Sequence, residues 1–297
     1  MKINYLAPTI APALDSQYCL ESPHMAMSYY ASLGHEFVYY HKKYMGSRCQ
    51  IYLFEDDSSY VVSKTGRVIW NKAYQRVDLS NQIERLKKQC DWSTQKMYLF
   101  DAELMPWSTL GKNLIDKKFK GYYEAKRLNL IACNSYNRQI HECINIHSRE
   151  DTPWFSIFDC LKIVYKNDKE IIYPTNDEIN TSIYDYGLFF QWPVTVDLDH
   201  IFSQYDISIE GFVIKPIVVS RDVLPAIKCR TNLFLKMLYG ERNIYEIKCM
   251  KQKSIAKKQA RALREHQLAW DMLHIPYSQC TEVVLSNHRP EDEDPRL

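Results

Sequence analysis

The sequence lacks the features that mark membrane-spanning or secreted chains. Its longest apolar runs, such as GLFF and GFVI, are far too short to cross a bilayer, and the first residues lack the apolar stretch of a signal peptide. Nine cysteines occur without a single C-x-x-C pair, which argues for reduced thiols rather than a disulfide framework. We therefore expect a cytoplasmic protein that does not act at a membrane.

Glycine is also scarce, with only 8 among 297 residues, and neither an internal repeat nor a low-complexity linker is present. The chain is 46% apolar and 25% charged, which is ordinary for a globular protein with a real core. Because glycines are few, each one is informative. Gly46 stands in the stretch HKKYMGSRCQIYLF, directly before a run that reads as a strand.

The periodicity predicts an α+β protein, with strands first and helices last. Residues 22–34 and 80–90 read as helices, and residues 37–70 are rich in β-branched and aromatic residues separated by turn signals. Residues 108–150 carry helix-length patterns and no strong strand signal, so we expect a helical insertion there. Three further strand-like runs follow, PWFSIFDCLKIVY, EGFVIKPIVV and AIKCR, and then a long helix from about residue 254 to 273.

The charge is uneven near the C-terminal end. Seven basic residues between positions 243 and 264 face a single acid, Glu246, whereas the last eight residues, PEDEDPRL, are acidic. The basic segment fits a phosphate-rich partner, although a solvated helix face would look the same on charge alone.

Five short motifs occur in a fixed order. The first is Lys43, Gly46 and Arg48, in the spacing K-x-x-G-x-R; DAEL (101–104), FSIFD (155–159), EGFVIK (210–215) and IKCR (227–230) follow. This series is similar to the nucleotidyl motifs of covalent nucleotidyltransferases, the polynucleotide ligases and capping enzymes that form a lysyl-nucleotide. Each match is weak alone, and their common order makes the series specific.

The segments KYMGSR, DAELMPWS, EGFVIKP and IKCRTNLFLKMLYG resemble the ligase domain of the bacterial polynucleotide kinase-phosphatase-ligase RNA-repair enzymes, over about residues 5 to 275. The resemblance implies an antiparallel-sheet nucleotidyltransferase (adenylation) domain over 1–230, with the helical insertion at about 108–150. A helical C-terminal module would follow over 231–285, and an acidic tail over 286–297. Because the pattern after residue 230 is helical, we expect no OB-fold barrel there.

The expected nucleophile is Lys43, whose amine must lose its proton before it can attack an α-phosphate. Burial and the neighbouring cations Lys215, Lys228 and Arg230 would lower its pKa. The same cations would bind the phosphates and stabilise the charge that develops as pyrophosphate leaves. Gly46 would allow either a close backbone approach or a positive φ.

The remaining candidates would bind the nucleotide. Arg48 would hold the ribose or a 5′-phosphate, and Glu103 would accept hydrogen bonds from the ribose hydroxyls. Phe158, or in second place Phe155, would stack on the purine. Glu210 would bind the divalent metal, and Arg67 would be a further phosphate contact.

The resemblance thus implies an ATP-dependent RNA ligase that uses Mg or Mn, acts on 5′-phosphate and 3′-hydroxyl RNA ends, and has a partner such as an RNA methyltransferase or an end-healing enzyme. Two alternatives stay open. One is a capping-type guanylyltransferase that takes GTP, and the other is a degenerate RNA-binding module without turnover. A lysine, Lys42, also stands where the relatives commonly have an acid before the nucleophile.

Overall fold

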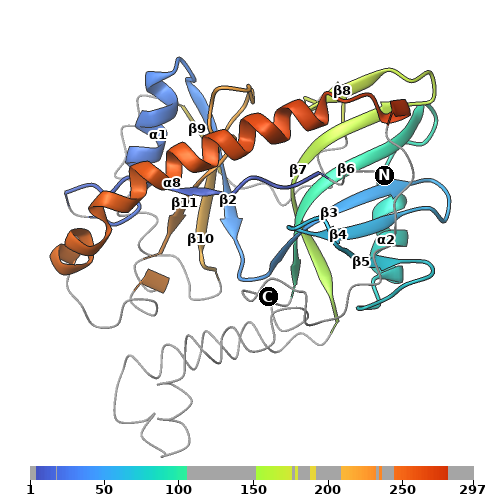
Figure 1. Cartoon of the computed structure of the whole chain (residues 1–297), viewed down its shortest axis with the longest axis horizontal. Coiled ribbons are helices and arrows are strands. Elements are labelled where there is room, and N and C mark those ends of the chain that lie inside the picture. The colour runs from blue at the N-terminus through green and yellow to red at the C-terminus, as the bar shows by residue number, and fades with distance from the viewer. Residues whose placement is uncertain are drawn as a thin grey trace, which may run out of the picture.

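The computed structural model of the chain describes residues 5–17, 19–105, 152–175, 178–179, 188–191, 209–231, 234–235 and 244–279. Figure 1 shows two β-sheets side by side, crossed by one long helix. Among the helices in these ranges, none combines the length and apolarity needed to cross a membrane.

The strands form two separate sheets. The first has the order β1-β11-β10-β2-β9, made of Ala11–Pro12 (β1), Ile227–Arg230 (β11), Gly211–Pro216 (β10), Phe37–Lys43 (β2) and Leu188–Gln191 (β9). The second has the order β5-β4-β3-β6-β7-β8, made of Val68–Asn71 (β5), Tyr60–Ser63 (β4), Ser47–Phe54 (β3), Gln95–Met105 (β6), Trp154–Tyr165 (β7) and Glu170–Ile172 (β8). Among the described strands, β1 and β11 pair in parallel and all other pairs are antiparallel.

The second sheet is buried on both faces. Along β3, Ile51 and Leu53 enter one core with helix α2 (Ser80–Lys87), whereas the alternate residues Tyr52 and Phe54 enter another on the opposite face. A strand buried on both sides needs a nearly continuous apolar run, and QIYLF supplies it.

The first sheet packs against helix α1 (Pro23–Ser32), which begins where Ser22 accepts a hydrogen bond from the amide of Met25. Tyr30 of α1 is fully buried in the core, and its hydroxyl donates to the carbonyl of Leu224 at 3.0 Å. The helix ends at Ser32, and Gly34, two residues further on, has a φ of +85°, the left-handed conformation that glycine adopts without strain.

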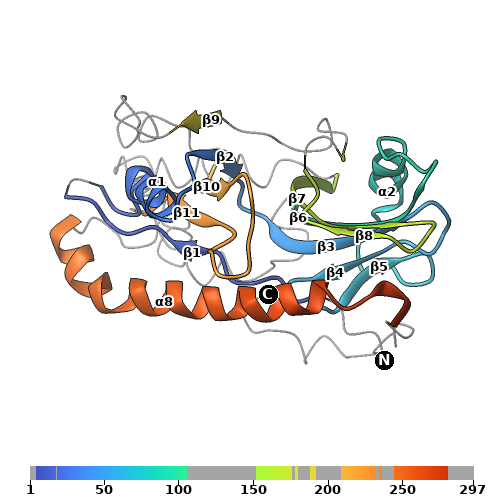
Figure 2. The same cartoon turned by 90° about the horizontal axis from the view of Figure 1, so that it is seen from above.

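Helix α8 (Ile244–Leu273) ties the two sheets together. Ala262 packs in the core of the first sheet, and Ala269 and Leu273 pack in a core of the second. Ala262 and Ala269 lie on one face of the helix, and their small side chains let the helix approach the sheets closely. Both views show the helix running past both sheets beside the N-terminal segment (Figures 1 and 2).

The C-terminal end of α8 is held by a buried lysine of β7. Lys162 is 5% exposed and donates to the carbonyls of Leu273 at 2.7 Å and Ile275 at 2.9 Å. It also forms an ion pair of 2.6 Å with Glu170, which in turn accepts the amide of Tyr277 in the short 3-10 helix η4 (Tyr277–Gln279). The last carbonyl of the helix and one just beyond it are therefore satisfied by a side chain from the sheet.

The α+β class with antiparallel sheets agrees with the sequence-based prediction, as do helices α1 and α2. Helix α8 begins ten residues before the predicted start near residue 254, and the short strand β9 was not predicted. The predicted insertion at 108–150 and the acidic tail at 286–297 lie outside the described residues. The domain division at residue 230 and the absence of an OB-fold stay predictions.

Candidate active site

The K-x-x-G-x-R motif joins the two sheets. Lys43 is the last residue of β2 in the first sheet, and Arg48 lies near the start of β3 in the second. Between them, Gly46 passes so close to β6 that a Cβ would lie 2.6 Å from Cγ of Glu103 and 2.7 Å from the carbonyl oxygen of Leu104. Of the two expected reasons for this glycine, the structure therefore favours a close backbone approach.

Lys43 and Glu210 form an ion pair. The ammonium of Lys43 donates to Oε2 of Glu210, and the amide of Glu210 donates to the carbonyl of Lys43 at 2.7 Å. Both side chains are mostly buried, with 16% and 14% of their surfaces exposed. The carboxylate of Glu103 acts on the same ammonium from the second sheet.

The expectation that the pKa of Lys43 is lowered was wrong for this state of the chain. Burial and the charge of Arg230 do lower this pKa, but the charges of Glu210 and Glu103 raise it more, so that it lies above its ordinary value. The sequence motifs identified the cations and gave no distance to the carboxylates. Lys43 is therefore held protonated.

Lys228 and Arg230 occupy β11, two strands from Lys43. Burial, followed by the charges of Arg230 and Lys43, lowers the pKa of Lys228 to about 8. The charges of Lys43, Arg230 and Lys228 all lower the pKa of Glu210, although burial opposes them. Three cations from β2 and β11 thus act on one carboxylate, directly before β10.

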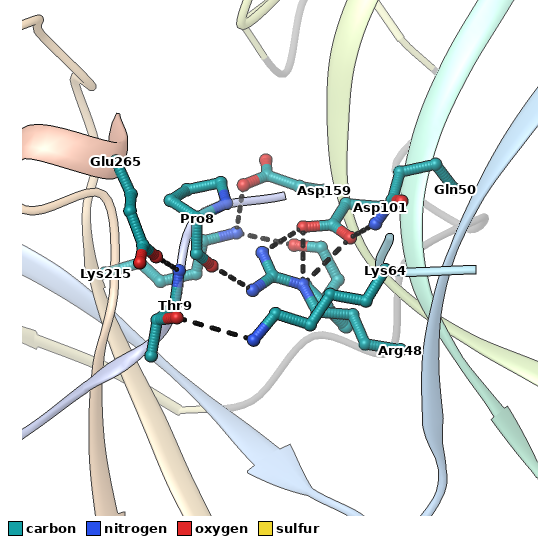
Figure 3. A network of polar contacts seen from close by, with 10 residues as sticks. Pro8, Thr9, Arg48, Gln50, Lys64, Asp101, Asp159, Lys215 and Glu265 are labelled. Atoms are coloured by element: carbon teal, nitrogen blue, oxygen red, sulfur yellow. Dashed lines mark hydrogen bonds and ion pairs between the residues drawn. The ribbon is translucent and has the colours of Figure 1, made fainter. Parts of the chain in front are cut away.

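Arg48 is held by the second sheet and the N-terminal segment. Its Nε donates to the carboxylate of Asp101 at 3.1 and 3.2 Å, and its Nη1 donates to the carbonyl of Pro8 (Figure 3). Gln50 donates to the same carboxylate at 2.9 Å. In this state the guanidinium of Arg48, which was expected to hold a ribose or a 5′-phosphate, is paired with Asp101.

Lys215 reaches from the first sheet to the second. Its Nζ donates to the carbonyl of Phe158 at 2.6 Å and forms an ion pair of 2.6 Å with Asp159. The ring of Phe158 lies 5.5 Å from Cζ of Arg48 and 5.9 Å from Nζ of Lys215, which are cation–π distances. Phe155, the second choice for stacking, packs instead against the core of the second sheet.

Glu103 is half-buried opposite Lys43. Burial raises its pKa to about 7; Lys43 opposes this shift and Glu210 adds to it. Across the described part of the chain, no group of three His, Cys, Asp or Glu side chains could enclose a metal. Two carboxylates nevertheless suit Mg²⁺, which is usually held by one or two of them together with phosphates and water.

Arg67 lies just after the turn between β4 and β5. Its amide donates to Oγ of Ser63 at 3.3 Å, and its Nη1 is buried without a hydrogen-bond partner in the described structure. A buried donor of this kind fits a phosphate contact, but no contact joins Arg67 to the other candidates in the described ranges. Its role stays a prediction.

Sequence reasoning missed three residues that fix this constellation. Asp101 and Asp159 were inside the quoted motifs DAEL and FSIFD, so that only their roles were overlooked. Glu21 lies in a loop and gave no motif signal. Both of its carboxylate oxygens accept hydrogen bonds from Arg230.

Comparisons with known proteins identify the family and the fold of this chain. The family model described as "PNKP adenylyltransferase domain, ligase domain" matches residues 1–152, about half of the chain. No curated protein matches. A structure titled "Structure of the Pnkp1/Rnl/Hen1 RNA repair complex" is 24% identical, with a TM-score of 0.71, covering 94% of this chain and 88% of that one.

A second structure, titled "Structure of Pnkp1/Rnl/Hen1 complex", is also 24% identical, with a TM-score of 0.68 and coverage of 94% and 89%. An RNA ligase of Naegleria gruberi, solved with AMP and Mn, gives 12% identity, coverage of 77% and 63%, and a TM-score of only 0.39. The first two structures show the fold, and the family model shows the family. The chain belongs to the family of PNKP ligase (adenylyltransferase) domains.

Proposed function

We propose that the protein is an ATP-dependent RNA ligase that forms a covalent lysyl-AMP on Lys43. The observation that carries the proposal is the position of this lysine. It is mostly buried at the junction of two sheets, and Lys228 and Arg230 act on the same carboxylate partner. Such a cluster is poorly suited to a structural core, and it is well suited to binding phosphate oxygens.

In the first step the amine of Lys43 attacks the α-phosphorus of ATP. An N–P bond forms, the bond from the α-phosphorus to the bridging oxygen breaks, and pyrophosphate leaves. The ammonium must first give up a proton, and Glu103, with a pKa of about 7, is a nearby group able to take it. Lys215, Lys228 and Arg230 would bind the phosphate oxygens as charge develops on them.

A divalent cation, Mg or Mn, fits the two carboxylates beside Lys43. Glu210 would hold it, with Glu103 nearby. When bound, such an ion would offset phosphate charge and compete with the Lys43 ammonium for the Glu210 carboxylate. Arg48, Arg67 and Phe158 would contribute the nucleotide contacts predicted for them.

The later steps would act on RNA ends. AMP passes from Lys43 to the oxygen of a 5′-phosphate, and a 3′-hydroxyl then attacks that phosphate and releases AMP. Family membership supports this choice of substrate. In the part of α8 whose side chains are described, the exposed basic residues Lys257, Lys258, Arg261 and Arg264 offer contacts for the RNA backbone.

A protein partner is also part of the proposal. The structures with TM-scores of 0.71 and 0.68 are of Pnkp1/Rnl/Hen1 complexes. By analogy, we propose that sealing by this chain needs an associated RNA methyltransferase or end-healing enzyme, whereas formation of lysyl-AMP does not. Labelling without sealing by the isolated chain is the expected outcome.

The test is incubation of the protein with radiolabelled ATP or GTP and Mg²⁺, followed by acid precipitation. We expect an adduct with ATP and none with GTP, and a gain of one AMP on the peptide that contains Lys43 by mass spectrometry. Lys43→Ala should abolish the adduct. Lys42→Ala is the matched control, because Lys42 is the adjacent lysine and is exposed on the other side of the strand.

The alternatives give different outcomes. An adduct with GTP alone would favour the capping-type guanylyltransferase. If wild type and Lys43→Ala both fail to label with either nucleotide and bind RNA equally well, the degenerate RNA-binding module is the correct interpretation.

A further inference from the structure

The loop that precedes helix α1 places a carboxylate inside the protein. Glu21 is fully buried and has a φ of +52°, a left-handed conformation that is uncommon for residues other than glycine. Two bonds hold the loop in this form: the amide of Glu21 donates to Asp15 at 2.7 Å, and the amide of Ser22 donates to the carbonyl of Leu14 at 3.0 Å. The surrounding structure therefore imposes this backbone conformation on a charged residue.

The carboxylate of Glu21 forms an ion pair with Arg230. Nε of Arg230 donates to Oε2 at 2.8 Å and its Nη2 donates to Oε1, so that the two groups meet as a bidentate fork. The backbone amide of Arg230 also donates to Oε2, at 3.3 Å. One carboxylate thus fixes both the side chain and the backbone of this arginine.

Arg230 lies next to the candidate nucleophile through the backbone of the first sheet. It pairs across the strands with Gly211, which also pairs with Lys43 on its other side. The amide of Thr231 donates to the carbonyl of Glu210 at 3.0 Å, and the amide of Glu210 donates to that of Lys43 at 2.7 Å. Gly211 permits this crowding, because a Cβ there would lie 2.5 Å from Cα of Arg230.

We propose that Glu21 is a positioning residue for nucleotide binding and for formation of lysyl-AMP, and that it acts through Arg230. Its carboxylate sets the direction of the guanidinium, so that Arg230 presents its positive charge to the triphosphate in a fixed place. This inference rests on the proposed function. A long arginine side chain without this anchor would lose its orientation, and a misplacement of about 1 Å can cost roughly 100-fold in rate.

The rival interpretation is a purely structural ion pair. In that case removal of Glu21 would lower stability and slow the reaction through general loosening, whether or not Arg230 is present. The two interpretations are separated by a double-mutant cycle of Glu21→Gln, Arg230→Ala and the double variant.

Two readouts are measured for each variant: the rate of adduct formation with labelled ATP, and the affinity for ATP by titration calorimetry. We expect Glu21→Gln to slow labelling by about 10-fold to 100-fold and to weaken ATP binding. In the Arg230→Ala background, Glu21→Gln should have no further effect. Glu21→Asp keeps a carboxylate and tolerates a positive φ, so it should recover part of the rate.

Glu170→Gln is the matched control. Glu170 belongs to another largely buried ion pair, with Lys162, at the end of α8 and away from Lys43. It should lower the melting temperature and leave labelling well below that temperature unchanged. If Glu21→Gln does not fold, Glu21→Asp enters the cycle in its place.

Three results would overturn the inference. They are a Glu21 variant with wild-type rate and affinity, a Glu21 effect of equal size with and without Arg230, and a labelling loss in Glu170→Gln equal to that in Glu21→Gln. If the wild type binds ATP but forms no adduct, the proposed function is refuted and the role of Glu21 is not, since calorimetry still measures the coupling between Glu21 and Arg230 in ATP binding. A wild type that neither binds nor labels refutes both.

Discussion

Replacing Gly46 by alanine adds a single methyl group at the crossing between the two sheets. That methyl carbon would lie 2.6 Å from Cγ of Glu103, 2.6 Å from Sδ of Met105 and 2.7 Å from the carbonyl oxygen of Leu104. The methionine side chain can move, but the carbonyl belongs to the backbone of β6. The β2–β3 connection must therefore shift away from the second sheet.

The size of the effect follows from these contacts. Overpacking of this kind costs about 1 to 3 kcal/mol of unfolding free energy. Because Lys43 is three residues away, the shift also moves its amine relative to Glu103 and the cations of the first sheet. A displacement near 1 Å would reduce the rate of lysyl-AMP formation by about 100-fold.

Gly34→Ala is the control, since it is a second glycine substitution with a different cause. The added Cβ would meet nothing within 4 Å, but the φ of +85° is unfavourable for alanine by about 1 to 2 kcal/mol. Urea unfolding should give losses of similar size for the two variants. Adduct formation, measured where both are folded, should fall in Gly46→Ala alone.

Wild-type labelling by Gly46→Ala would contradict this reasoning, because the glycine would then serve no purpose at the junction. Equal loss of labelling in both variants would show that lower stability, and not the position of Lys43, controls the rate.

Three further predictions concern buried charges. Lys162→Met should lower the unfolding free energy by about 3 to 5 kcal/mol in urea titrations, because it leaves the carboxylate of Glu170 without its buried partner. Lys228→Met should raise stability at pH 7 by up to about 3 kcal/mol while abolishing labelling, since the native state lowers the pKa of this lysine from 10.5 to about 8. The gain is complete below pH 8 and should vanish as the pH rises through 10.5, so a gain independent of pH would contradict it. In the wild type, Glu103 should make stability fall as the pH rises from about 4.5 to 7, because the native state binds the proton of this carboxyl more tightly than the unfolded chain does. Glu103→Gln should remove this fall, and a pH profile of thermal unfolding equal to that of the wild type would contradict the prediction.

The motif residues could be placed from the sequence because each motif is short and local in the chain. Lys43, Glu103, Glu210 and Lys215 were chosen because their motifs resemble those of a known family. In the structure Glu210 and Glu103 act on Lys43, and Lys215 reaches from the first sheet to Asp159 of the second. Their catalytic roles stay predictions. The α+β class followed in the same way from local periodicity.

The partners of these residues could not be predicted in this way. Glu21 meets Arg230 across 209 positions of sequence, and no periodicity marks a loop that buries a carboxylate. The sign of the pKa shift at Lys43 depends on its distances to Glu210 and Glu103, which only the packing of the two sheets fixes. Long-range contacts of this kind carry no local signal.

The joining of the N-terminal segment to α8 has a consequence for folding during synthesis. The amide of Thr9 donates to Glu265 at 2.8 Å, and the carbonyl of Pro12 accepts from Gln259 at 3.0 Å. Residues 256 and 247 positions apart must therefore meet, which demands a large loop closure. During synthesis β1 is made long before its covering helix, and until α8 follows, the apolar surface beneath that helix stays open to water.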